Sequence, residues 1–163
     1  MNDSKTKIFA AAAVLCVLGT FGTVLIYRTA FAGQATVRKQ VIGFPGAKPS
    51  ALPFSTAIKC GNMLFLSGVI GTDLETGELV SPDVDGQTHQ CLKKLKTVLK
   101  EAGMDLSHAV RATVYLVDIE DYNQMNQAYG EHFKDTVPPA RACVQVAKLV
   151  KGAKVEISMI AME

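Results

Sequence analysis

Short apolar runs separated by polar turns are typical of β-strands, and they dominate residues 41–80. Pro45 ends the first run, and Cys60-Gly61-Asn62 separates the second and third runs as the turn of a β-hairpin would. Residues 72–78 follow as a turn in which Gly77 is free to adopt a positive φ. The three predicted strands are 41–44, 54–59 and 63–70.

Two later segments repeat apolar residues at helical spacing, every three or four positions. The first is 86–102, whose lysines fall largely outside the apolar stripe, and Gly103 ends it. The second begins after Asp118, a good N-cap, and its aromatic stripe is typical of a helix that packs on a core. The stripes contain Cys91, Leu92, Leu95, Val98 and Leu99 in the first helix and Ile119, Tyr122, Met125 or Asn126, Tyr129 and Phe133 in the second.

Three further strands complete the expected element list. Residues 110–117 are rich in β-branched residues, and Pro138-Pro139 forces an extended backbone before 141–150 and 154–162. The order β-β-β-α-β-α-β-β predicts an α+β fold. Two helices can cover only one face of a six-stranded sheet, so the other face must meet water or a second subunit, and an apolar face predicts an oligomer.

The N-terminal segment has a different character. Residues 8–27 contain no charge and no proline, and as a helix they would be roughly 30 Å long, enough to cross a bilayer. We therefore expect a membrane segment and linker over 1–39 and a separate domain over 40–163. A cleaved signal peptide, with Ala30-Phe31-Ala32 as the cleavage site, and an organelle-targeting segment are the alternatives.

Cysteines and charge bear on compartment and partner. The domain has three cysteines, an odd number that favours a reducing compartment and so the cytosolic side of the membrane. Residues 1–39 hold five basic residues against one acidic residue, a net charge of +4, and the rest carries −2 to give the chain total of +2. A faintly acidic domain is a poor match for a polyanion, so no nucleic acid is expected and a small ligand suits it better.

Several common chemistries have no support in the sequence. Neither a P-loop nor a dinucleotide-binding glycine pattern occurs, and Ser67 lacks the glycine of a nucleophile elbow. His89, His108 and His132 are far apart in the sequence, without metal-ligand spacing. No metal site is expected.

Charged residues within the last apolar strands are the strongest chemical signal. Arg141 and Cys143 are two apart on a strand and therefore share a face. A guanidinium there suits a bidentate clamp on a substrate carboxylate, although a surface ion pair is an equally simple interpretation. Glu156 interrupts Val155 and Ile157, and an exposed strand position would also explain it. Cys143 alone indicates a small buried apolar residue.

The domain resembles the Rid family, the YjgF-like reactive-intermediate deaminases. The resemblance extends from about residue 41 to 162. It rests on matching segments in the same order: LSGVIGTDLETGELV at 66–80, KEAG at 100–103, VRATVYLVDIEDYNQMN at 110–126, and PPARACVQVAKL followed by KVEI at 138–157.

The resemblance implies a chorismate-mutase-like homotrimer with ligand clefts between neighbouring subunits. It also implies hydrolysis, without a cofactor, of enamines and imines of 2-amino acids to 2-keto acids and ammonia. The expected substrates are 2-aminoacrylate, 2-iminopropanoate and 2-iminobutanoate.

The resemblance further assigns roles to individual residues. Arg141 corresponds to the carboxylate-binding arginine, and the backbone of Cys143 to a wall of the cleft. Glu156 corresponds to the residue that orients or activates the attacking water, and Ser67 and Gly68 to a pair beside the ligand. Phe54 stands where many active members carry tyrosine, so a hydroxyl that could touch the substrate is missing.

Two other functions are compatible with the sequence. One is a trimeric ligand-binding or chaperone-like module without chemistry, which the Phe54 departure allows. The other, less favoured, is the RNA-cleaving, translation-inhibiting activity ascribed to some relatives.

Overall fold

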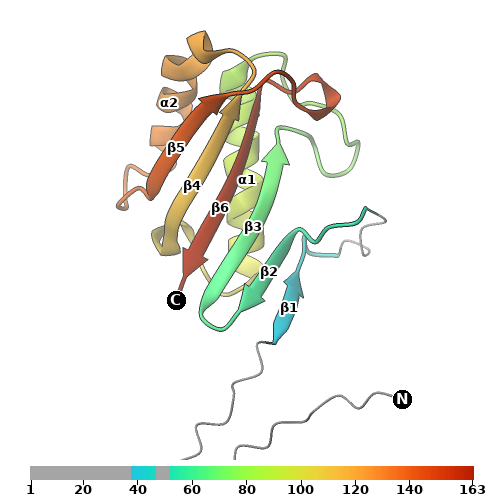
Figure 1. The fold of residues 1–163 in the computed structure, drawn as a ribbon, viewed down its shortest axis with the longest axis vertical. Helices are drawn as coiled ribbons and strands as arrows, with labels where there is room; N and C mark the ends of the chain where they lie inside the picture. The colour runs from blue at the N-terminus through green and yellow to red at the C-terminus, as the bar shows by residue number, and fades with distance from the viewer. Residues whose placement is uncertain (1–37, 47–51) are drawn as a thin grey trace, which may run out of the picture. The chain divides into compact units, whose positions relative to one another are not determined.

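The computed structural model describes residues 38–46 and 52–163, which form a six-stranded sheet with two helices. The sheet order is β1-β2-β3-β6-β4-β5, and every neighbouring pair is antiparallel except β4 and β5. Figure 1 shows this order. The main elements are β1 (Lys39–Ile42), β2 (Ala57–Cys60), β3 (Met63–Ile70), α1 (Val84–Glu101), β4 (Ala109–Leu116), α2 (Tyr122–Glu131), β5 (Ala140–Gln145) and β6 (Val155–Met162).

Both helices lie on the same side of the sheet, behind it in Figure 1. α1 packs against β3 and β6 at the centre of the sheet and against α2 beside it. The predicted α+β class, the six strands and the coverage of one face by two helices are confirmed.

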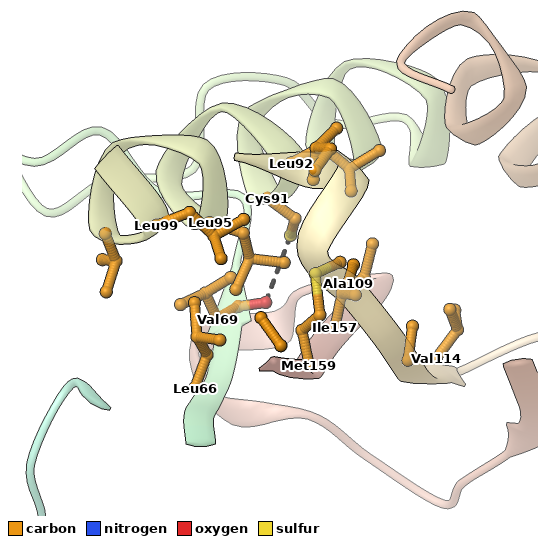
Figure 2. Packing of buried hydrophobic residues seen from close by; sticks show 14 of the residues in the cluster. Leu66, Val69, Cys91, Leu92, Leu95, Leu99, Ala109, Val114, Ile157 and Met159 are labelled. Carbon is orange, nitrogen blue, oxygen red and sulfur yellow. Dashed lines mark hydrogen bonds between the residues drawn. The ribbon is translucent and has the colours of Figure 1, made fainter. Parts of the chain in front are cut away.

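The hydrophobic core lies between α1 and the sheet, as Figure 2 shows. Residues of β6 alternate between the two faces, so that Val155, Ile157, Met159 and Ala161 are buried against the helices. From α1, the stripe predicted from spacing supplies the other half of the core, since Cys91, Leu92, Leu95, Val98 and Leu99 are all buried. The Cys91 thiol also donates to the Val69 carbonyl at 3.1 Å.

Turn chemistry predicted from glycines is confirmed at the hairpin and after β3. Gly61, between β2 and β3, has φ = 60°, and Gly77 has φ = 74°, both in the left-handed region that favours glycine. β3 has the predicted bounds, 63–70. The ends of β1 and β2 differ from the predicted 41–44 and 54–59 by one to three residues, because cross-strand pairing rather than the apolar run sets them.

Three other predicted bounds are corrected. α1 begins at Val84, since the Asp83 side chain accepts the Gly86 N–H at 2.7 Å and caps the helix earlier than the apolar stripe indicates. Asp118 caps a short 3-10 helix, Ile119–Asp121, and α2 starts only at Tyr122. β5 ends at Gln145 instead of continuing to 150, and Val150–Gly152 forms another 3-10 turn.

A β-bulge interrupts β3 at Ser67 and Gly68. Leu66 pairs with Met159 and Val69 pairs with Ile157, so three steps along β3 match two steps along β6. Because Leu66 and Val69 are both buried, the extra residue keeps both on the core face. The bulge therefore re-aims the backbone at the pair that the resemblance places beside the ligand.

The prediction of a membrane-anchored protein is corrected. Within residues 38–46 and 52–163, no helix has the length and apolar character needed to cross a bilayer. The predicted N-terminal helix, 8–27, lies outside the described residues.

Candidate functional site

Arg141 lies on the edge strand β5 and faces α2. Its partner across the parallel pairing is Ala112, which is buried against the helices, and laterally paired residues share a face. Cys143 pairs in the same way with the buried Val114. The predicted shared face of Arg141 and Cys143 is therefore the helix-covered one.

Three residues of α2 hold the Arg141 guanidinium. Its Nη2 donates to Asn126 Oδ1, and its Nη1 lies 3.8 Å from Met125 Sδ. Its carbon Cζ lies 4.5 Å from the centre of the Tyr129 ring, a cation–π contact. The Tyr129 ring in turn stacks on Phe133 at 4.8 Å between centroids. These contacts fix the orientation of the guanidinium and leave other N–H groups able to bind an anion.

A hollow of about 450 Å³ lies beside the guanidinium. Its walls come from α2, from the segment before β5 and from Arg141 itself. Such a volume is within the range of small-molecule pockets, about 300–1,000 Å³. The lining residues are Asn126, Tyr129, Gly130, Phe133, Pro138, Pro139 and Arg141.

Cys143 is half-buried and packs against the hydrophobic core. Burial raises the pKa of its thiol, an effect that the nearby Arg141 charge opposes. A thiol with a raised pKa is a poor nucleophile. The Cys143 side chain therefore packs against the core and is not a reactive thiolate.

Glu156 lies on β6, against the bulge of β3. A Cβ atom on Gly68 would collide with the Glu156 carboxylate and would lie 2.8 Å from its Cδ atom. Only glycine at residue 68 lets the carboxylate rest directly on the neighbouring backbone. Burial raises the pKa of the Glu156 carboxyl. A partly desolvated carboxylate of this kind is a stronger proton acceptor than an exposed one.

Ser67 and Phe54 have different surroundings. The Ser67 hydroxyl donates to the Ser55 carbonyl at 2.8 Å, which ties β3 to the segment before β2. Phe54 lies in that same segment, and 57% of its surface is exposed. The Ser67 side chain is thus engaged in holding the chain, while the Phe54 ring is open to a ligand or a second subunit.

Arg141 and Glu156 do not meet within one chain. Glu156 pairs with Tyr115 of β4, whereas Arg141 is level with Ala112. Tyr115 and Ala112 point to opposite faces, because buried residues alternate along β4. Arg141 and Cys143 therefore face the helices, where Asn126 lies, and Glu156 lies on the other face of the sheet, against Gly68.

Two contributors to the site were not singled out from the sequence. The sequence predicts Tyr129 only as a core aromatic, and the residue is buried. Its ring also makes the cation–π contact with the Arg141 guanidinium. Asn126 occupies a position of the helix stripe where an apolar residue is the norm. A polar residue at such a position is the sequence signal that indicates a contact with another polar group.

Histidines that are distant in the sequence meet between the helices. His89 Nδ1 and His132 Nε2 are 2.9 Å apart. In the part of the chain that the structure describes, no three His, Cys, Asp or Glu residues are arranged to hold a metal ion.

Comparisons with known proteins match nearly the whole described domain. The family model described as Endoribonuclease L-PSP matches residues 46–163. Reactive Intermediate Deaminase A, chloroplastic, of Arabidopsis thaliana is 39% identical over 99% of this chain and 89% of its own length. Human 2-iminobutanoate/2-iminopropanoate deaminase is 39% identical over 80% of this chain and 94% of its own length.

Solved structures agree with these matches. The crystal structure of Escherichia coli TdcF with bound serine superimposes with a TM-score of 0.72 at 32% identity, covering 77% of this chain and 99% of TdcF. The family model spans most of the chain, the relatives match along nearly their full length, and a solved structure has the same fold, so this chain belongs to the YjgF/Rid family.

Proposed function

We propose that the protein hydrolyses imines and enamines of 2-amino acids to 2-keto acids and ammonia, in clefts between the subunits of a homotrimer. The relatives named as reactive-intermediate and 2-imino-acid deaminases support the reaction class. One observation above all supports the assignment of the site. Asn126 and Tyr129 hold the Arg141 guanidinium in place beside a hollow.

Arg141 binds the carboxylate of the substrate. A guanidinium pairs with a carboxylate through two parallel N–H donors, and a partly desolvated cleft strengthens that pairing. Because Asn126 and Tyr129 already fix the orientation of the side chain, little ordering is needed when the substrate binds. The clamp thereby sets the position of C2, the carbon next to the carboxylate.

Glu156 activates the water. A protonated imine is electrophilic at C2, so the carboxylate takes a proton from water as the oxygen adds to that carbon. Glu156 then passes that proton to the nitrogen of the tetrahedral intermediate. As the C–N bond breaks, the hydroxyl proton goes to the Glu156 carboxylate, the keto group forms, and the departing ammonia takes up that proton. Water supplies the oxygen, and no electron transfer is involved.

A second copy of the chain must bring Glu156 to the clamp, since the two side chains face opposite sides of one sheet. The face without helices is suited to contact with another copy. Val41, Ile58, Phe65 and Ile160 are laterally paired across β1, β2, β3 and β6. Val41 is 64% exposed and Phe65 is 42% exposed. This apolar row supports burial between subunits.

The test is an assay with 2-aminoacrylate generated enzymatically in the presence of the purified protein. We expect keto-acid release well above the rate in buffer. Arg141→Ala should abolish that acceleration while the oligomer persists in sedimentation. An unchanged rate with wild-type protein would instead support a binding module without chemistry, and near-normal turnover by the variant would refute the clamp.

A further inference from the structure

We propose that the hollow beside Arg141 binds the side chain of the substrate and selects imino acids with branched or larger apolar side chains. This inference rests on the proposed function and specifies its substrate class. 2-Iminopropanoate has only a methyl side chain, so its hydrolysis would leave most of this hollow empty.

The position of the hollow follows from the clamp. In a 2-imino acid the side chain and the carboxylate are attached to the same carbon. A carboxylate held by the guanidinium therefore places the side chain within a few bonds of Arg141, which is itself a wall of the hollow. The imine nitrogen, by contrast, must be directed toward the water and Glu156.

The lining of the hollow is chiefly apolar. Tyr129 and Phe133 contribute stacked rings, both at least nine-tenths buried, and Pro138 and Pro139 add two further apolar side chains to the lining. Of the polar side chains, Asn126 and Arg141 bond to each other, and the Tyr129 hydroxyl is buried without a partner among the described residues. The rings and prolines make up most of the lining, and such walls favour hydrocarbon.

The volume exceeds the needs of a methyl group. A liquid water molecule takes about 30 Å³, so a hollow of about 450 Å³ has room for many non-hydrogen atoms. A single well-buried methylene changes kcat/KM by roughly 10-fold or more in apolar enzyme pockets. A substrate with the leucine side chain should therefore be strongly preferred.

Gly130 keeps the hollow open. Asn126 and Gly130 lie four residues apart on α2 and so share one face, and Phe133 lines the same hollow from the turn that follows the helix. A Cβ atom at residue 130 would meet nothing within 4 Å. A larger side chain can therefore be introduced there without a clash and would project on the face that lines the hollow.

The first experiment compares imines generated by an amino acid oxidase from leucine and from alanine. We expect kcat/KM for the leucine-derived imine to exceed that for the alanine-derived imine by at least about 10-fold. If both are hydrolysed and the ratio is one or less, this inference is overturned and the proposed function stands. If neither is hydrolysed, both are overturned.

The second experiment fills the hollow. Gly130→Leu should lower the leucine-to-alanine ratio by at least about 10-fold. The matched control, Gln127→Leu, adds the same side chain to an exposed position of α2 that does not line the hollow, and should keep the wild-type ratio. A Gly130→Leu protein that folds and retains the wild-type ratio would overturn the assignment. If Gly130→Leu does not fold, the leucine-to-alanine ratio measured on the wild-type protein and on Gly130→Ala tests the assignment instead.

Discussion

Arg141 and Glu156 project from opposite faces of one sheet, the first toward α2 and the second toward the uncovered side. Their strands, β5 and β6, flank β4, and the alternation of side chains along β4 settles the directions. A reaction that uses both residues at one carbon therefore needs two copies of the chain. The proposed oligomer would then be a condition for activity.

Gly68→Ala tests the contact between the bulge and the carboxylate. The new methyl group collides with the Glu156 carboxylate, so we expect kcat to fall and the free energy of unfolding to drop by about 1–3 kcal/mol. Chemical denaturation measures the loss. In a double-mutant cycle, Glu156→Ala should remove most of the additional destabilisation, because it removes the colliding group. Simple additivity would contradict the contact.

Glu156→Gln separates catalysis from stability. Burial raises the pKa of this carboxyl, so the folded state binds the proton more tightly than the unfolded state, and ionisation as the pH rises costs stability. The variant should lose turnover but gain stability relative to wild type as the pH rises above the ordinary carboxyl pKa of 4.5. Unfolding curves across that range provide the measurement. If the free energy of unfolding of wild type instead exceeds that of the variant by an amount that grows with pH, the surroundings stabilise the carboxylate and the prediction is wrong.

Tyr129 combines a useful ring with an unpartnered hydroxyl. Its buried OH has no hydrogen-bond partner among the residues the structure describes, and burial raises its pKa to about 12. Tyr129→Phe keeps the ring beneath Arg141 and should raise the free energy of unfolding by about 1 kcal/mol with little change in KM. Tyr129→Leu should raise KM by roughly 3- to 30-fold, because the cation–π contact is lost. Equal KM values for the two variants would count against the ring as a support for the clamp.

His132 should make the fold sensitive to acid. Burial, with help from Lys96 and His89, lowers its pKa from 6.5 to about 4. Between these values the unfolded chain binds a proton that the folded chain excludes, so stability falls as the pH drops. His132→Gln should reduce that loss, which urea denaturation at several pH values would show. Parallel stability profiles for variant and wild type would argue that the histidine pair does not contribute.

The sequence was most informative where one physical signal acted alone. The stripe of Leu92, Leu95 and Leu99 defined α1 because only one helix face can be buried. The end of β5 was misplaced because the apolar run continues past Gln145 while pairing with β4 does not. Arg141 and Glu156 could be selected as charges within apolar strands. Their placement on opposite faces could not, since it depends on strand order and register.

Mixing two inactive variants tests the shared cleft most directly. Arg141→Ala and Glu156→Gln chains, unfolded together and refolded in equal amounts, should regain about a quarter of wild-type imine hydrolysis, because that fraction of interfaces pairs an intact Arg141 with an intact Glu156. Each variant refolded alone should remain inactive. If the mixture is as inactive as its parents although mixed oligomers form, the two residues do not act across a subunit boundary.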